Sequence, residues 1–512
     1  MRQSRFLFDT ADTWINTHFS SKSKSIVSSI ATSYLARALT SQVYEVAIET
    51  PLSHAPAISA LLNNQVYLKR EDLQPVFSFK IRGAYNKISK LSNEQKAKGI
   101  VTCSAGNHAQ GVALSAKKLE INATIVMPLA TPSIKVDAAR RLGGPTVNIL
   151  LHGQNYDEAA AEANKLVIND GLTMIHPFDD PEVIAGQATI GIEIIKHLNG
   201  KPFDAVFVCV GGGGLLAGTA ASIKALRPDV KIIGVEADDA AGMMTSLKHD
   251  KVETLTHVGL FADGAAVKRV GDETFRICKE LVDEMITVET DELCAAIKLG
   301  FNDTRCILEP AGALAIAGMC KYSRLNECKN KTFVAISSGA NMDFDRLRFV
   351  SERADSSETL MAVSIPEKPG SFRQLYQLLR PRNVTEFSYR HDGSDKANVF
   401  MSVQSIQGMQ IDKDKPALVE ILEKNAYTVT DLSANEMAKA HARHLVGGRS
   451  LRSGHAATIE KELVYRFEFP EAPGALDKFL TTLNHFNQGE SYPITFPPIF
   501  NLIIFKCIKI RK

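Results

Sequence analysis

The sequence predicts an α/β fold with a mainly parallel sheet over residues 45–345, followed by a smaller region of mixed strands and helices. Two observations predict the α/β part. Short apolar runs alternate with longer amphipathic segments, and the runs are rich in β-branched residues and bounded by Gly or Pro, which is typical of strands buried on both faces. A third observation is that the chain becomes charged and polar near residue 350, after which one pattern occurs twice.

The expected strands are QVYLKR from Gln65, GIVTC from Gly99, NATIVMP from Asn122, TVNILL from Thr146, DAVFVCV from Asp204, KIIGVEA from Lys231 and TFVAISS from Thr332.

Composition limits the class of protein. A chain of 512 residues, 45% hydrophobic and 23% charged, is expected to fold into two or three domains. Its net charge of +2 leaves no basic excess for neutralising phosphates, so we expect no nucleic-acid partner. No stretch reaches the roughly 18 to 20 apolar residues that a membrane helix needs. The eight cysteines form no C-x-x-C pair, which favours reduced thiols and no metal site.

Residues 1–40 differ from the rest of the chain in amino-acid composition. The first 34 residues are rich in serine, and Asp9 and Asp12 are their only acids. This composition resembles an organelle transit peptide. A disordered N-terminal tail is the alternative.

A duplicated unit follows the α/β region. IPEKPGSFRQLYQLL from Ile365 and FPEAPGALDKFLTTL from Phe469 are offset by 104 residues, and each reads as a strand, a Pro-Gly turn and a helix. The first copy continues through two more strand patterns, so we expect a complete domain over 360–430. The second passes into an apolar tail containing Pro497 and Pro498, and we expect 460–512 to be incomplete and to lack strand partners.

Lys80 is the first candidate for chemistry. It lies in KREDLQPVFSFKIRGAY among Phe77, Phe79 and Ile81 instead of on a polar face. A partly desolvated amine has a lowered pKa, and a neutral amine can attack a carbonyl to form a Schiff base. Most lysines are surface charges, so these residues alone only suggest the role.

Two strand ends carry small polar residues. Ser104, Gly106 and Asn107 precede an expected helix and could present N–H groups to an anion, although an ordinary helix cap has the same appearance. Ser338 follows the last expected strand, and its hydroxyl could hydrogen-bond a ring nitrogen.

Four consecutive glycines follow the strand VFVCV, and a helix follows them. Glycine lets a backbone approach a ligand closely and adopt positive φ, so we interpret the segment as a phosphate cradle at a helix N-terminus. A dinucleotide site is the alternative, because Glu236 lies 22 residues after Gly214, where a ribose-binding acid belongs. The spacing of Gly211, Gly213 and Gly218 departs from G-x-G-x-x-G.

Five motifs in order resemble the biosynthetic threonine dehydratases of the fold-type-II pyridoxal-phosphate enzymes over about 300 residues: the Lys80 segment, SAGNHAQG, VGGGGLLAG, EPAGA and SGAN. The family fold comprises two open twisted α/β subdomains, expected here over 41–345. HLVGGRS and FPEAPGAL resemble the tandem ACT-like regulatory tail of the same enzymes. The segments around Gln42 and Leu260 are similar to plant forms, which favours a plastid location over a cytoplasmic or mitochondrial one.

The resemblance implies a role for each motif. Lys80 would hold pyridoxal 5'-phosphate through a Schiff base and take the substrate α-proton, Asn107 would hydrogen-bond the phenolic oxygen, and Ser338 would face the ring nitrogen. The residues expected to bind the phosphate are Gly211, Gly212, Gly213, Gly214 and Leu215. The residues expected to bind the substrate carboxylate are Ser104, Ala105, Gly106, Asn107 and His108.

The resemblance also implies partners. L-threonine, and L-serine as well, would be deaminated to a 2-oxo acid and ammonia as the first step towards isoleucine, isoleucine would be an allosteric inhibitor, and the chain would form homotetramers. Related serine racemases bind a divalent metal through an acid six residues after the position of Glu236, where this chain has Gly242, so no such metal site is expected. Two alternative functions are considered. One is a binding or regulatory protein that kept the fold but lost catalysis, and the other is a nicotinamide-dependent oxidoreductase.

Overall fold

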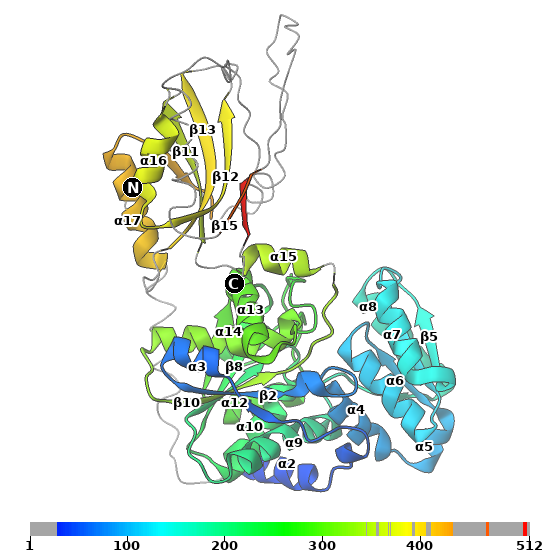
Figure 1. The fold of residues 1–512 in the computed structure, drawn as a ribbon. Coiled ribbons are helices and arrows are strands. Elements are labelled where there is room, and N and C mark those ends of the chain that lie inside the picture. The colour runs from blue at the N-terminus through cyan, green and yellow to red at the C-terminus, as the bar shows by residue number, and fades with distance from the viewer. Residues whose placement is uncertain are drawn as a thin grey trace, which may run out of the picture. The chain divides into compact units, whose positions relative to one another are not determined.

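One parallel, one mainly parallel and one mainly antiparallel sheet form the framework of the protein (Figure 1). The computed structural model describes residues 28–344, 346–354, 358–366, 368, 370–391, 395–405, 411–433, 467–470 and 505–508. The chain divides into two compact units, Met1–Ala354 and Asp355–Lys512.

The larger sheet of the N-terminal unit has the order β1-β2-β10-β7-β8-β9. All neighbouring strands are parallel except β1 and β2, so the sheet is of the mainly parallel kind that the sequence predicts. Its strands are β1 Leu52–His54, β2 Gln65–Arg70, β7 Ala205–Cys209, β8 Lys231–Ala237, β9 Glu284–Val288 and β10 Thr332–Ser337.

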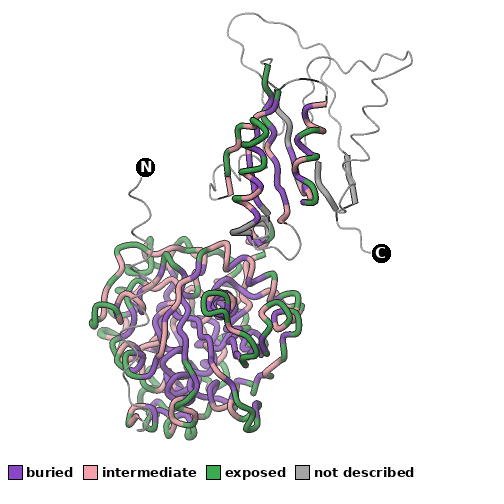
Figure 2. Tube along the Cα trace, turned by 90° about the vertical axis from the view of Figure 1, so that its left-hand side faces the viewer, coloured by how far each residue is buried: buried purple, intermediate pink, exposed green. Residues whose placement is uncertain are grey.

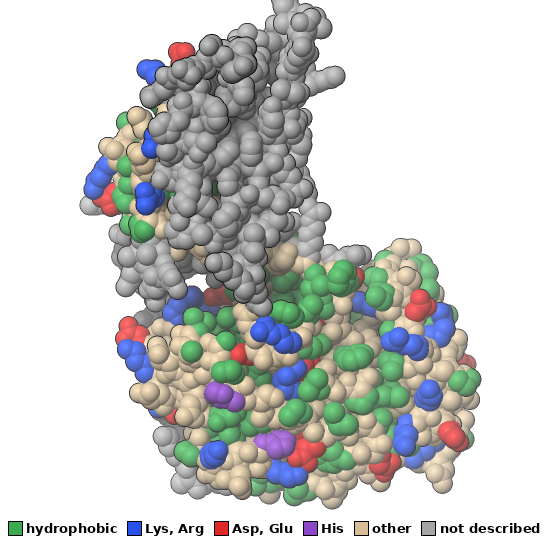
Figure 3. Space-filling model, viewed as in Figure 1, with side chains coloured by type: hydrophobic (Ala, Val, Ile, Leu, Met, Phe, Trp, Pro, Cys, Tyr) green, Lys and Arg blue, Asp and Glu red, His purple; other side chains and the backbone are tan. Residues whose placement is uncertain are grey.

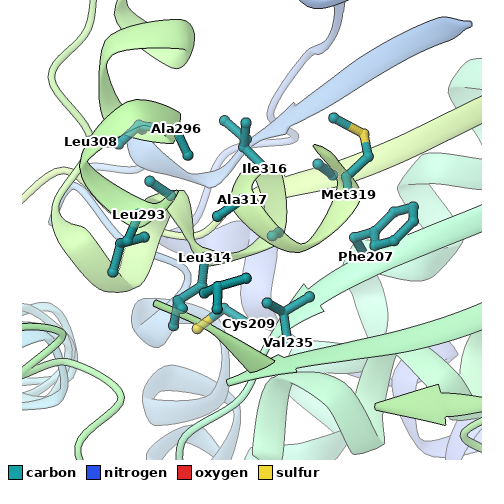
Figure 4. Packing of buried hydrophobic residues seen from close by; sticks show 14 of the residues in the cluster. Phe207, Cys209, Val235, Leu293, Ala296, Leu308, Leu314, Ile316, Ala317 and Met319 are labelled. Carbon is teal, nitrogen blue, oxygen red and sulfur yellow. The ribbon is translucent and has the colours of Figure 1, made fainter. Parts of the chain in front are cut away.

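Helices cover both faces of this sheet, which explains the continuous apolar runs. Along β7, Val206 and Val208 pack into a cluster with α9 and α10, whereas Phe207 and Cys209 pack with α13 and α14 (Figure 4). Successive strand residues point to opposite faces, so each face needs its own apolar set. The covering helices are α9 Pro181–Leu198, α10 Gly214–Leu226, α13 Thr290–Thr304 and α14 Pro310–Leu325. Buried residues accordingly fill the interior of the unit (Figure 2).

The smaller sheet has the order β5-β4-β3-β6, and all of its strands are parallel. Met127 packs with α6 and α7, while its neighbour Val126 packs with α8, so this sheet too is covered on both faces. Its strands are β3 Ile100–Cys103, β4 Ala123–Met127, β5 Val147–Leu151 and β6 Thr173–Met174. The helices of this region are α4 Lys80–Ser89, α5 Asn93–Lys98, α6 Asn107–Leu119, α7 Ser133–Gly143 and α8 Tyr156–Asp170.

The remaining helices of the N-terminal unit are α2 Ser29–Leu39, α3 Pro56–Leu62, α11 Gly242–His249, α12 Asp272–Leu281 and α15 Arg346–Arg353. Acidic and basic side chains are interspersed on the face of this unit seen in Figure 3. Among the described helices, none combines the length and the apolar character needed to cross a membrane.

The C-terminal unit contains a sheet of order β14-β11-β13-β12-β16-β15, in which only β15 and β16 run parallel. Leu375 of α16 and Leu418 of α17 pack on its apolar residues, such as Val399 and Met401. The strands are β11 Glu358–Pro366, β12 Asn383–His391, β13 Lys396–Gln404, β14 Thr428–Asp431, β15 Phe467–Pro470 and β16 Phe505–Ile508, and the helices are α16 Ser371–Leu379 and α17 Ile411–Lys424.

This unit confirms part of the expected repeat and corrects another part. The first copy has its strand, helix and two further strands as β11, α16, β12 and β13. Of the second copy, residues 471–504 lie outside the described part of the chain. The expectation that 460–512 lacks strand partners is wrong for Phe505–Ile508, which pairs with β12 and β15. The prolines at 497 and 498 exclude ladder hydrogen bonds only at their own positions.

Candidate active site

The four motifs singled out in the sequence all follow the carboxyl ends of parallel strands. Lys80 follows β2 after a short turn, Ser104 follows β3, Gly211 follows β7 and Ser338 follows β10. Three of these strands belong to the larger sheet and β3 belongs to the smaller one, and ligands of open α/β folds bind at the carboxyl ends of such strands. The fold therefore puts all four candidate segments where a ligand site is expected.

Hydrogen bonds join the Lys80 segment to the Ser338 segment. The N–H of Phe79 donates to the Ser338 carbonyl at 3.1 Å, and the N–H of Ala340 donates to the Phe77 carbonyl at 2.8 Å. These bonds hold the start of α4, where Lys80 lies, against the loop after β10.

The Lys80 amine lies in a sheltered environment. Its Nζ donates to the carbonyl of Pro177 at 2.8 Å and lies 5.4 Å from the centre of the Phe79 ring. Burial lowers the pKa of the Lys80 amine to about 8. Phe77, which the sequence places near Lys80, is 52% exposed and adopts a φ of 55°. The direction of this pKa shift agrees with the expectation from the sequence.

Asn107 is the first residue of α6, and its side chain is held on both sides. Its Nδ2 donates to Glu309 Oε1 at 2.5 Å, and its Oδ1 accepts from Asn341 Nδ2 at 2.6 Å. The preceding turn is closed by Ser104, whose Oγ accepts from the N–H of Gly106 at 3.3 Å. The interaction with Glu309 was not foreseen from the sequence.

His108 is buried beneath this loop, whereas Ala105 and Gly106 are partly exposed. The Nε2 of His108 lies 2.9 Å from the carbonyl of Ile175, to which it must donate, so Nδ1 is left unprotonated. Nδ1 has no hydrogen-bond partner in the described part of the chain. Burial lowers the pKa of the imidazole to about 3, so His108 is neutral at physiological pH.

The glycine loop ends in the N-terminus of α10. Gly213 has a φ of 97°, a conformation that residues with a Cβ rarely adopt. A Cβ at Gly212 would collide with the ring of Phe178, so this position also requires glycine. The first N–H groups of a helix lack intrahelical acceptors, which leaves those of Gly214 and Leu215 available to an anion.

Residues 271–274 form hydrogen bonds to this glycine loop. Thr274 Oγ1 donates to the carbonyl of Gly212 at 2.7 Å, and the N–H of Gly271 donates to the same carbonyl at 3.2 Å. Asp179 in turn accepts hydrogen bonds from the first N–H groups of α12, including that of Thr274 at 3.2 Å. These contacts occupy the Gly212 carbonyl and fix the orientation of its peptide group, and none of them was foreseen from the sequence.

Ser338 is buried, and its hydroxyl donates to the carbonyl of Ala311 at 3.2 Å. The Cys209 side chain lies at the end of β7, beside Ser338. Burial raises the pKa of the Cys209 thiol to about 11, so the group beside Ser338 stays uncharged.

The geometry of Glu236 argues against a dinucleotide site. Glu236 is fully buried, and its carboxylate accepts from the N–H groups of Met243 and Met244 at 2.7 and 2.9 Å. Both oxygens therefore cap α11, which begins at Gly242, and neither is presented to a ribose. This observation removes the main support for the nicotinamide alternative.

The groups at this edge fit pyridoxal phosphate. The ligand's aldehyde requires an amine of lowered pKa, which Lys80 supplies, and its phosphate requires N–H donors at a helix start, which the glycine loop supplies. Its ring requires a neutral hydrogen-bond partner for nitrogen and a donor for the phenolic oxygen, as Ser338 and Asn107 can provide.

Comparison with known families agrees with this fit. The family model described as "Pyridoxal-phosphate dependent enzyme" matches residues 43–339. The model described as "C-terminal regulatory domain of Threonine dehydratase" matches residues 350–442.

Individual relatives agree as well. The L-threonine dehydratase biosynthetic IlvA of Burkholderia multivorans is 50% identical over 471 residues, which are 90% of this chain and 91% of the relative. The chloroplastic threonine dehydratase 1 of Solanum lycopersicum is 50% identical over 87% of this chain and 72% of the relative. The solved structure of processed threonine deaminase isoform 2 from Solanum lycopersicum is 52% identical, with a TM-score of 0.62, over 63% of this chain and 88% of that one. The chain therefore belongs to the pyridoxal-phosphate dependent enzymes and, within them, to the biosynthetic threonine dehydratases.

Proposed function

We propose that the chain deaminates L-threonine to 2-oxobutanoate and ammonia with pyridoxal phosphate as cofactor, and that this reaction is the first step of isoleucine biosynthesis. L-serine is proposed as a second substrate. The observation that carries the proposal is the convergence of the Lys80 amine, the glycine loop, Asn107 and Ser338 at one edge of the fold. The 50% identity to a biosynthetic threonine dehydratase supports it.

Each group of site residues has its own role in the proposed reaction. Pyridoxal phosphate, when bound, supplies an electron sink for negative charge at the substrate α-carbon. Lys80 holds the cofactor, and its amine then takes the α-proton, for which a lowered pKa is suited. The neutral Ser338 hydroxyl is the partner of the ring nitrogen. The loop Ser104–His108 binds the substrate carboxylate, and Gly211–Leu215 bind the cofactor phosphate.

An assay of 2-oxo-acid release from threonine and from serine tests the proposed function. The purified chain should release ammonia and 2-oxobutanoate in equal amounts from threonine, and should be coloured because a bound cofactor absorbs visible light. A colourless protein without 2-oxo-acid release would contradict the proposal and favour a fold that has lost catalysis.

The pKa of Lys80 leads to a prediction about cofactor capture. Only the neutral amine attacks the aldehyde, so the rate at which cofactor-free protein binds pyridoxal phosphate covalently should rise with pH and reach half its maximum near pH 8. N-acetyl-lysine methylamide, with an ordinary amine, should reach half-maximum near a pH of about 10.4. Rapid-mixing absorbance across this pH range measures both. A protein midpoint that coincides with that of the model amine would refute the sheltered environment of Lys80.

Regulation by isoleucine is a further prediction. We propose that isoleucine acts through a regulatory part that comprises residues 360–430 and the second copy of the repeat over 460–512. To inhibit, isoleucine must favour one of two arrangements of this regulatory part, and the coupling free energy of such effectors is about 1 to 3 kcal/mol. Because the sequence after Leu483 departs from that of the first copy, we expect threonine deamination to persist but isoleucine inhibition to be weak. Rate assays with increasing isoleucine test this, and strong sigmoidal inhibition would prove the expectation wrong.

We further propose a plastid location and a homotetrameric assembly. The chloroplastic relative from Solanum lycopersicum supports the first, as does the serine-rich composition of the N-terminal residues. Cytoplasmic and mitochondrial locations remain the alternatives. The assembly rests on the family resemblance alone, and light scattering of the purified chain measures it.

A further inference from the structure

The side-chain amide of Asn107 can adopt only one of its two orientations. The Val76 carbonyl, which can only accept, receives a hydrogen bond from Asn341 Nδ2 at 2.9 Å. Asn341 is thereby oriented, and the same Nδ2 donates to Asn107 Oδ1 at 2.6 Å. A reversed Asn107 amide would place two NH₂ groups against each other, which is repulsive.

Glu309 imposes the same orientation from the other side. Its carboxylate accepts from Asn107 Nδ2 at 2.5 Å, and a reversed amide would set an oxygen against this carboxylate. Glu309 is only 5% exposed, so the loss of the Asn107 donor would remove a hydrogen bond from a buried carboxylate that water cannot readily replace. Burial raises the pKa of Glu309 to about 7. The hydrogen bond to Asn107 opposes that rise, which indicates that the amide stabilises the ionised form.

The backbone holds both partners in place. The N–H of Glu309 donates to the carbonyl of Gly339 at 3.2 Å, and Pro310 follows at the first position of α14. Glu309 and Asn341 are therefore tied to the segment that carries Ser338. They are set in position by the sheet and by α14, and not by Asn107 itself.

We propose that Glu309 and Asn341 are positioning residues that orient the Asn107 amide, so that its second Nδ2 hydrogen faces the phenolic oxygen of bound pyridoxal phosphate. This inference rests on the proposed function. Nδ2 carries two hydrogens, of which Glu309 takes one and leaves the other for the ring. The relevant property is the orientation of an amide that would otherwise rotate, since neither residue is required to touch the reacting atoms.

The orientation has a spectroscopic consequence. A donor at the phenolic oxygen stabilises its anion and keeps the shared proton on the adjoining lysine nitrogen, a form that absorbs visible light. Without the donor, or with Oδ1 turned towards the ring, the proton moves to oxygen and the absorption moves to the near ultraviolet. The ratio of the two bands thus reports the orientation of Asn107 independently of turnover.

The test compares Glu309→Ala, Glu309→Gln and wild-type protein, each saturated with pyridoxal phosphate. Glu309→Ala should lose much of the visible band to the near-ultraviolet band and bind the cofactor about tenfold more weakly, the size of one hydrogen bond. Glu309→Gln keeps an acceptor oxygen for Asn107 Nδ2 and should restore most of the visible band. Asn341→Ala removes the other partner and should shift the bands in the same direction as Glu309→Ala.

Asp303→Ala is the matched control. Asp303 is another carboxylate of this unit and accepts from the N–H groups of Ala57 and Ile58 at 2.8 and 3.0 Å. Its loss should lower stability without changing the ratio of the two bands, and circular dichroism verifies that each variant is folded.

The outcomes separate this inference from the proposed function. A coloured wild-type protein whose band ratio is unchanged in both Glu309→Ala and Asn341→Ala would overturn the inference alone. A band shift in Glu309→Gln as large as that in Glu309→Ala would also overturn it, because orientation by an acceptor oxygen would then not be the cause. A wild-type protein without either band would overturn the proposed function and this inference with it.

Discussion

Replacement of Lys80 by alanine is expected to reduce threonine turnover by at least about 10³-fold while the chain still folds. One amine both holds the cofactor and takes the α-proton in the proposed mechanism, so its removal eliminates two roles together. Lys80 starts α4, where alanine is well tolerated, and its side-chain hydrogen bond is to the Pro177 carbonyl. The measurement is 2-oxobutanoate release by purified variant and wild-type protein, with circular dichroism as the check on folding.

Lys90→Ala is a suitable control because Lys90 lies at the other end of the same helix. Its amine forms an ion pair with Glu182 at 2.6 Å near the surface, where such pairs contribute little. We expect near wild-type turnover from this variant. Steady-state turnover by Lys80→Ala within tenfold of wild type would show that another group performs the proton transfer.

Replacement of Gly213 by valine is expected to weaken cofactor binding by at least about tenfold. The φ of 97° is unfavourable for a residue with a Cβ, by about 1 to 2 kcal/mol in the left-handed region. The new Cβ would also lie 2.7 Å from Met243 Cε and 2.8 Å from Thr274 Oγ1, and because Thr274 also hydrogen-bonds the Gly212 carbonyl, we expect the loop to shift. Any such movement displaces the N–H donors proposed to bind the phosphate. Titration of cofactor-free protein with pyridoxal phosphate measures the affinity.

Gly200→Val separates the two causes. Gly200 also has a positive φ, of 78°, but a Cβ there meets no atom within 4 Å. We expect this variant to lose some stability and to keep its cofactor affinity. Equal affinities for Gly213→Val and wild-type protein would mean that the glycine loop is not the phosphate cradle.

The catalytic core could be predicted from sequence because its signals are local. In β7, a run of five apolar residues from Ala205 fills clusters on both faces of the sheet, and such a run is typical of a strand between two helical layers. The four glycines that lead into α10 and the Lys80 segment are likewise contiguous, so their chemistry could be interpreted before any contact was known.

The supporting residues could not be predicted in the same way, because their contacts join distant parts of the chain. Thr274 hydrogen-bonds the carbonyl of Gly212, which lies 62 residues earlier in the chain. Glu309 hydrogen-bonds Asn107, which lies 202 residues earlier. Glu309 lies within the EPAGA motif and directly before a helix-starting proline, so its position was noticeable although its partner was not. The strand at Phe505–Ile508 was not predicted because two prolines precede it, although proline excludes ladder hydrogen bonds only at its own position.

The covalent attachment site of the cofactor tests the central claim most directly. Borohydride reduces a carbon–nitrogen double bond to a stable amine, so treatment of the purified protein should remove its colour and fix the cofactor on one lysine. Digestion and mass spectrometry then identify that lysine. The structure leads us to expect the added mass on the peptide that contains Lys80 and on no other. A label on a different lysine, or colour that survives reduction, would contradict the account.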